Sequence, residues 1–221
     1  MITYKGKNRR LFSADDNENV ILITAPQQSG GGEPKAREIV TEGTHIYFFQ
    51  DVTTESVQDL VVTLRRMTAS ILEFTTDLEL PEPPPIHLHI NTNGGDAFAG
   101  FSASFSIASN PIPVYTYVDG QVASAGTFMS LAGAKRFMQP QSFMLIHQVS
   151  SGVWGTYADI VDEKESLDRI MEKARELYKK YTKISDERLD DLLNGNLWLN
   201  AEECLELGFV DEVQKLSLIH I

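Results

Sequence analysis

The chain has 221 residues, of which 42% are apolar and 23% are charged, and its formal net charge is −12. This length suits one α/β domain. The negative charge argues against nonspecific binding to nucleic acid or to an anionic membrane, and no stretch approaches the roughly 20 apolar residues of a membrane span. The apolar run at 20–23 is too short for a signal-peptide core, so we expect a cytoplasmic protein. Cys204, the single cysteine, excludes an internal disulfide and is interpreted as a buried structural thiol.

Two end segments lack regular patterns. Residues 1–44 are interpreted as an irregular N-terminal segment, with a short strand at 20–24 and a mobile glycine run at 30–32. Residues 214–221 differ from what precedes them and are interpreted as a tail, a candidate cloning or sequencing remnant. The predicted domain is therefore 45–213.

Residues 45–213 alternate between strand and helix patterns. Thr53 or Thr54 is suited to cap the first helix, whose apolar residues recur at spacings of three and four. We predict strands at 45–50, 86–91, 114–118, 143–147 and 209–213, and helices from residue 54, around 98–107, and at 121–132, 156–183 and 200–207. This alternation predicts an α/β fold of strand–helix–strand units on a parallel sheet.

The predicted helix at 156–183 is long and amphipathic. Its apolar face comprises Ile160, Leu167, Ile170, Met171, Ala174, Leu177, Tyr178 and Tyr181, and the opposite face is charged. Such a stripe must be buried, either against the chain's own domain or against a partner subunit, and the sequence leaves both open.

Ser124 lies in the segment GQVASAG, after a predicted strand and at the opening of a predicted helix. Small neighbours let a substrate backbone approach closely. The free N–H groups and positive dipole at a helix start suit a developing oxyanion. Alone, a serine in this setting is more often a helix cap or a packing residue.

Gly94 and Gly95, in the segment NTNGGD, also follow a predicted strand and precede a helix. Paired glycines can direct backbone N–H groups into a cleft, although alone a tight turn is the simpler explanation. His147 ends the predicted strand at 143–147, and active sites gather at the carboxyl ends of parallel strands. The meeting of Ser124, His147 and the glycine pair at one sheet edge favours an acyl-transfer site with nucleophile, base and oxyanion donors.

Together these motifs resemble the proteolytic subunit of the Clp protease family. GQVASAG resembles its nucleophile segment, LAGAKRFMQPQSFMLIHQ its histidine segment, NTNGGDAFAG its glycine segment, and LNAEECLELGFVDEV its closing helix and strand. The likeness extends from about residue 45 to 213. It implies a ClpP/crotonase-like fold in which 156–183 is a projecting handle helix.

The resemblance also implies a role for each matching residue. Ser124 would be the nucleophile of a serine endopeptidase, and His147 its general base. The backbone N–H groups of Gly95 and Ala125 would form the oxyanion hole, and Gly94 would contact the substrate. Unfolded proteins or peptides would be cleaved through an acyl-enzyme without metal or cofactor in this subunit, since ATP is used by a partner unfoldase.

The third catalytic position is occupied by Asn196, where the family usually has Asp. An amide oxygen can orient the imidazole of His147 by accepting a hydrogen bond, but it supplies no charge for the imidazolium. Asp190 and Asp191 lie a helical turn or more away and would substitute only if the chain bent differently. We therefore expect slow catalysis, or dependence on a more active partner subunit.

The resemblance implies a homo-oligomer of heptameric rings, stacked in pairs through the handles and fed by an AAA+ unfoldase. The docking cleft for that unfoldase is altered, because His87 and His89 replace the family's usual tyrosines and Ser109 replaces an aromatic residue. Leu197 stands in place of an arginine that pairs across the rings. The two histidines share one face of a strand, so a metal site there is a minor alternative.

Three other functions remain open. An inactive structural subunit of a mixed ring is supported by Asn196. A phage head-maturation or signal-peptide-peptidase-like protease would use Ser–Lys chemistry, for which Lys135, expected in a loop, is the nearest lysine. A crotonase-type acyl-CoA enzyme shares the glycine turn but has no need of Ser124 and His147 together.

Overall fold

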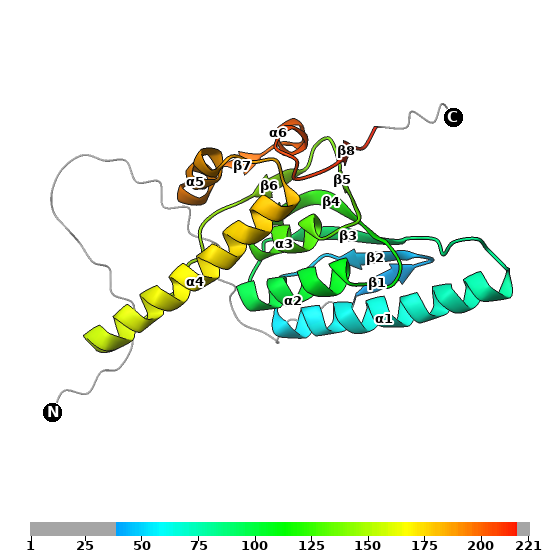
Figure 1. Ribbon diagram of the computed structural model, residues 1–221, viewed down its shortest axis with the longest axis horizontal. Coiled ribbons are helices and arrows are strands. Elements are labelled where there is room, and N and C mark those ends of the chain that lie inside the picture. Colours follow the sequence, from blue (N-terminus) through cyan, green and yellow to red (C-terminus); the bar gives the residue numbers. More distant parts are fainter. Residues whose placement is uncertain (1–38, 216–221) are drawn as a thin grey trace, which may run out of the picture. The chain divides into compact units, whose positions relative to one another are not determined.

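The computed structural model describes residues 39–215, and Figure 1 shows a sheet with helices packed on one face. The sheet has eight strands in the order β1-β2-β3-β4-β5-β8, and β6 pairs with both β4 and β7. The strands are β1 (Val40–Glu42), β2 (His45–Phe48), β3 (Ile86–Thr92), β4 (Val114–Ala123), β5 (Lys135–Met138), β6 (Phe143–Leu145), β7 (Trp198–Leu199) and β8 (Glu212–Val213). The helices are α1 (Thr54–Asp77), α2 (Ala97–Ala108), α3 (Ala125–Leu131), α4 (Tyr157–Tyr181), α5 (Asp186–Asn194) and α6 (Ala201–Glu206).

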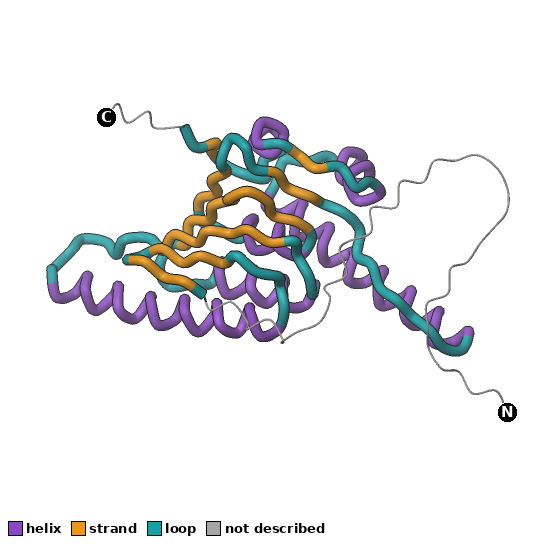
Figure 2. Tube along the Cα trace, turned by 180° about the vertical axis from the view of Figure 1, so that it is seen from behind, coloured by secondary structure: helices purple, strands orange, loops and turns teal. Residues whose placement is uncertain are grey.

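Successive crossovers build the parallel part of the sheet. β2, β3 and β4 pair in parallel, and α1 and α2 connect them. Alternate residues of β3 point to opposite faces, so Ile86, Leu88 and Ile90 are buried while His87 and His89 lie on the other face. Figure 2, seen from behind, shows the strands β1 to β4 in front of α1 and α2. The parallel α/β architecture predicted from the sequence is confirmed.

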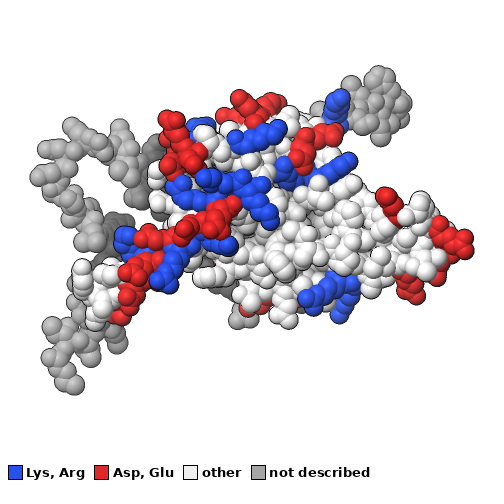
Figure 3. All heavy atoms as spheres, in the orientation of Figure 1, with Lys and Arg blue, Asp and Glu red and all other residues white. Residues whose placement is uncertain are grey.

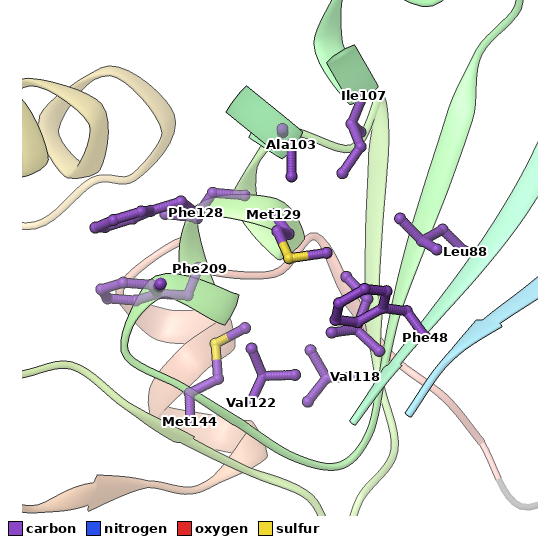
Figure 4. Packing of buried hydrophobic residues seen from close by; sticks show 14 of the residues in the cluster. Phe48, Leu88, Ala103, Ile107, Val118, Val122, Phe128, Met129, Met144 and Phe209 are labelled. Atoms are coloured by element: carbon purple, nitrogen blue, oxygen red, sulfur yellow. The ribbon is translucent and has the colours of Figure 1, made fainter. Parts of the chain in front are cut away.

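Apolar side chains from the sheet, α2 and α3 interlock between the two layers (Figure 4). The core includes Phe48, Leu88 and Val118 from the strands, Ala103 and Ile107 from α2, and Phe128 and Met129 from α3. Full burial of one Leu or Phe side chain contributes about 1.5–3 kcal/mol. This packing therefore holds α3, and the turn that precedes it, in a fixed position on the sheet.

Several expected element boundaries are wrong: the strands expected at 143–147 and 209–213 cover only 143–145 and 212–213, and two further differences lie beside Ser124. The strand expected at 114–118 continues as β4 to Ala123, because an irregularity after Ile90 of β3 accommodates extra residues of β4 and pairing resumes at Thr92 with Val122. The helix expected at 121–132 therefore begins at Ala125. The small residues of this segment suggested helix, but pairing within the sheet decides its structure.

Four elements were not predicted from the sequence: β1, β5, β7 and α5. Lys135, expected in a loop, begins β5, which pairs in parallel with β4. β1 lies within residues 1–44, so regular structure begins ahead of the expected boundary at residue 45. The expectations for 20–24, for 30–32 and for 216–221 fall outside the described residues. Within 39–215, no helix combines the length and apolarity that crossing a membrane requires.

Helix α4 divides its apolar stripe between two environments. It begins at a capping box formed by Thr156 and extends away from the sheet (Figure 1). In its C-terminal half, Ala174 and Tyr178 are buried in the chain's own core. In its N-terminal half, Tyr157 is 84% exposed and Ile160 is 48% exposed. The first half of the helix therefore offers apolar surface that the rest of residues 39–215 does not cover.

Candidate active site

A cleft of about 320 Å³ lies where β4 ends and where α2 and α3 begin, with α4 as one wall. Among the residues that line it are Gly95, Ser124, Ala125 and His147. Residues from three separate sequence motifs therefore line one cleft, as expected for the carboxyl edge of a parallel sheet.

Ser124 occupies the strained turn between β4 and α3, with φ of 54° and ψ of −126°. A positive φ in a residue with a side chain costs about 1–3 kcal/mol, and sharp strand-to-helix turns of this kind expose nucleophiles in other hydrolases. The Ser124 side chain makes no capping bond to α3, which removes the explanation of Ser124 as a helix cap. Its N–H donates to the carbonyl oxygen of Leu145 at 2.9 Å and ties the turn to β6.

Strand β6 places His147 beside this turn. Ala123 pairs in parallel with Leu145, so Ser124 and His147 leave neighbouring strands at the same edge. The next residue, Gln148, donates its N–H to the carbonyl oxygen of Leu193 at 3.0 Å and anchors the segment. In the described chain the Ser124 hydroxyl and the His147 ring are not hydrogen-bonded to each other, and catalytic hydrogen bonds often tighten only when substrate binds.

The glycine pair packs against the Ser124 turn. At Gly94, where φ is +90°, a Cβ would stand 2.6 Å from Ser124 Cβ, so only glycine permits this approach. Val52 donates its N–H to Gly94 O and accepts from the Asp96 N–H, both at 2.8 Å. Val52 and Gly95 thus form an isolated parallel β-bridge, in which the N–H of Gly95 points away from Val52. Gly95 also lines the cleft. This orientation is the one that an oxyanion donor requires.

Asn196 and His147 each lie two residues beyond the β6–β7 pair, at the same end of it. These strands are antiparallel, with Leu145 opposite Trp198. The pairing does not continue unchanged beyond these strands, because Gln148 donates its N–H to Leu193 O, and within residues 39–215 no hydrogen bond joins Asn196 to His147. Asn196 is exposed and does not line the cleft, so the structure does not bring it together with Ser124 and Gly95.

The chain matches the family model of the Clp protease over residues 40–216. It belongs to the Clp protease family. It is 35% identical over 133 residues to ATP-dependent Clp protease proteolytic subunit 2 of Treponema denticola, which covers 59% of this chain and 66% of that protein. It is 35% identical over 130 residues to proteolytic subunit 1 of Mycobacterium tuberculosis, covering 58% of this chain and 65% of that protein. The aligned part is slightly less than two thirds of the length of these Clp relatives.

Among solved structures, a mutant of ClpP1 from Listeria monocytogenes matches with a TM-score of 0.66 and 24% sequence identity. The match covers 78% of this chain and 92% of that one. The predicted ClpP/crotonase-like fold is thereby confirmed.

The other polar candidates in this Clp family member lie away from the cleft. Asp190 forms an ion pair with Arg175 of α4, and Asp191 is an exposed residue of α5. Cys204 is fully buried, and burial raises the pKa of its thiol to about 12. A thiol that stays protonated is not a nucleophile, so the interpretation of Cys204 as a structural residue is confirmed.

His87 and His89 belong to a cluster on the face of the sheet opposite the buried side chains of β3. His89 Nδ1 lies 2.7 Å from Asp119 Oδ2, its Nε2 lies 2.9 Å from His45 Nδ1, and His87 Nδ1 lies 2.8 Å from the Tyr117 hydroxyl. Burial, followed by the nearby His45 and His89, lowers the pKa of His87. Within residues 39–215, no group of three or more His, Cys, Asp or Glu side chains is placed to hold a metal ion.

Sequence reasoning missed the wall that α4 contributes to the cleft. Glu163, Leu167 and Ile170 line it together with Tyr178. Helical periodicity identified the apolar members of this set, but it carries no information on which part of the fold a helix faces.

Proposed function

We propose that this chain is a serine endopeptidase subunit of a self-compartmentalised Clp-type protease, with Ser124 as nucleophile and His147 as general base. The observation that carries the proposal is the convergence of a strained Ser124, His147 and the N–H of Gly95 on one cleft. The N–H groups of Gly95 and Ala125 would receive the oxyanion. Gly94, expected to contact the substrate, is buried against Ser124 and does not line the cleft, so we propose that it supports the nucleophile turn instead.

The proposed reaction has two steps. His147 takes the hydroxyl proton of Ser124 while Oγ attacks the scissile carbonyl carbon, and the charge that develops on the carbonyl oxygen is stabilised by the two N–H groups. The tetrahedral intermediate collapses, the amine leaves with the proton from His147, and an ester remains on Ser124. Water then gives a proton to His147 and attacks the ester, and the second product leaves as a carboxylic acid while His147 returns the proton to Ser124 Oγ. This mechanism uses no metal and no cofactor.

Asn196 would orient the His147 ring by accepting its second N–H. Unlike a carboxylate, the amide leaves the imidazolium of the transition state without a charged partner. We therefore propose a slower peptidase than a Ser–His–Asp triad would give, in which assembly with a more active subunit would raise turnover.

We also propose that the subunit assembles into heptameric rings that stack in pairs. Large apolar side chains are exposed on two elements: Phe98 is 67% and Phe105 is 73% exposed on α2, and Trp154 and Tyr157, near the start of α4, are 101% and 84% exposed. Figure 3 shows that the surface over α2 is mostly uncharged, whereas acidic and basic groups crowd α4. Exposed apolar groups of this size mark interaction surfaces.

Unfolded proteins or peptides in the cytoplasm would be the substrates of this assembly, delivered by an AAA+ unfoldase that uses ATP. The face that carries His87 and His89 departs from the family pattern for unfoldase docking, so we propose that the unfoldase partner differs from the usual one.

Hydrolysis of a fluorogenic peptide by the assembled protein tests the activity. Ser124→Ala and His147→Ala should each abolish turnover, because they remove the attacking atom and its base. The matched control is Ser130→Ala, since Ser130 is a buried serine of α3, the helix that follows Ser124, and its hydroxyl has no hydrogen-bond partner within residues 39–215. Equal turnover in wild type and Ser124→Ala would reject the assignment. Assembled wild type without any turnover, alone or with an active partner, would favour the structural-subunit alternative.

A further inference from the structure

We propose that Tyr178 and Thr127 are positioning residues for the Ser124 turn, forming a hydroxyl relay from helix α4 to the Ser124 carbonyl. The inference rests on the proposed role of Ser124 as the nucleophile. It adds a device that fixes both the nucleophile and one oxyanion donor.

The relay consists of two hydrogen bonds. Thr127 Oγ1 lies 2.6 Å from the carbonyl oxygen of Ser124 and 2.8 Å from the hydroxyl oxygen of Tyr178. A carbonyl oxygen only accepts, and the threonine hydroxyl has a single proton. Thr127 therefore donates to Ser124, and Tyr178 must donate to Thr127. The direction of the relay, from α4 towards the nucleophile turn, follows from this count of protons.

The hydrogen bond from Thr127 to Ser124 is of a common kind, whereas the one between Tyr178 and Thr127 joins distant parts of the chain. A threonine hydroxyl commonly bonds to a backbone carbonyl one turn earlier in a helix. Here the acceptor capacity of that hydroxyl is used by Tyr178, 51 residues further along the chain. Tyr178 is 1% exposed and its ring packs between Phe128 and Phe209. Burial raises the pKa of Tyr178 far above its usual range, so the group remains a donor at every working pH.

Anchoring the Ser124 carbonyl also orients the N–H of Ala125. The two groups belong to one planar trans peptide and point in opposite directions. The carbonyl is held by both the N–H and the hydroxyl of Thr127, at 2.9 Å and 2.6 Å. The Ala125 N–H is thereby directed away from the relay, and Ala125 lines the cleft. Strained turns such as that of Ser124 persist only when their surroundings over-determine them, and this relay is one such restraint.

The relay connects the geometry of the site to α4. Tyr178 lies in the buried half of that helix, and residues one to four turns earlier form a wall of the cleft. A displacement of α4 would lengthen the bond between Tyr178 and Thr127 and weaken the restraint that Thr127 places on the Ser124 peptide. Contacts that the exposed half of α4 makes with a partner subunit would therefore act on the nucleophile turn.

Four variants of the assembled full-length protein test the relay. Tyr178→Phe removes one hydroxyl and keeps the ring, and Thr127→Val removes the donor to Ser124. Thr127→Ser keeps a hydroxyl and is the conservative rescue. The matched control is Thr116→Val, because Thr116 is also buried and also donates its hydroxyl to a carbonyl of α3, that of Ser130, at 2.7 Å.

The measurements are kcat and KM for a peptide and the rate at which a fluorophosphonate labels Ser124. Loss of one oxyanion donor lowers kcat about 10²–10³-fold, so we expect misorientation by Thr127→Val to lower kcat and labelling about 10–100-fold with KM little changed. Tyr178→Phe should have a smaller effect in the same direction. Thr127→Ser and Thr116→Val should both remain near wild type.

Equal kcat in Thr127→Val and Thr116→Val would overturn the relay, as would unchanged kcat in Tyr178→Phe. If Thr127→Val does not fold, Tyr178→Phe decides alone, because it deletes only one oxygen atom. A wild-type protein whose labelling does not depend on Ser124 would instead contradict the proposed function, so the two failures are distinguishable.

Discussion

Replacing Gly94 by alanine tests how closely the glycine pair supports the nucleophile. The new Cβ would stand 2.6 Å from Ser124 Cβ, whereas ordinary contact begins at 3.4 Å, so the two atoms must separate by about 0.8 Å. A displacement of about 1 Å at a reacting centre costs about 10²-fold in rate. We therefore expect kcat for peptide hydrolysis to fall about 100-fold. The positive φ of Gly94 adds a loss of about 1–3 kcal/mol in the free energy of unfolding.

Gly43→Ala is the matched control for this substitution. Gly43 also has a positive φ, of +56°, but a Cβ there meets no atom within 4 Å. It lies in the turn between β1 and β2, away from Ser124. This variant should lose about 1–2 kcal/mol of stability and keep wild-type kcat per folded subunit. Wild-type kcat in Gly94→Ala, or equal losses of kcat in the two variants, would refute the reasoning.

Three further predictions follow from single side chains. Asn196→Asp should raise kcat at least about tenfold, since a carboxylate that accepts from His147 would stabilise the imidazolium. Asn194→Asp is the control. An unchanged kcat in Asn196→Asp would reject the assignment of Asn196 as the third catalytic residue. The pKa of Cys204 is raised from 9.0 to about 12, so its contribution to stability is full below pH 9 and is lost as the pH rises towards 12, by up to about 1.4 kcal/mol per pH unit. The free energy of unfolding, measured in urea, should fall less steeply with pH above pH 9 in Cys204→Ala than in wild type. Identical slopes in the two proteins would contradict the burial of the thiol. The lowered pKa of His87, caused first by burial and then by neighbouring histidines, means that the folded state resists protonation and loses stability below about pH 6.5. Between pH 7 and pH 5, the unfolding temperature should fall less in His87→Gln than in wild type. An equal fall in both proteins would contradict the lowered pKa of His87.

The sequence predicted the alternating fold because the periodicities of its strands and helices are local properties. The buried face of β3 and the cap of α1 at Thr53 appear in the structure as the residue pattern predicts. The end of β4 was not predictable in this way. Its last residues, up to Ala123, are small and helix-compatible, and only pairing with β3 and β6 keeps them extended.

The candidate site was predicted in its residue types but not in its geometry. Ser124, His147 and Gly95 were found from motifs and from the rule that sites gather at strand ends. The positive φ of Ser124 and the outward N–H of Gly95 arise from tertiary pairing, which no local pattern encodes. The bond between Thr127 and Tyr178 joins residues 51 positions apart and becomes visible only when α3 and α4 are packed together.

The central claim, that Ser124 is an activated nucleophile, is tested most directly by mapping fluorophosphonate modification in the assembled protein by mass spectrometry. We predict a single modified residue, Ser124, with labelling abolished in Ser124→Ala, strongly slowed in His147→Ala and unchanged in Ser130→Ala. Modification at another residue, or no modification of an assembled wild-type sample, would contradict the account.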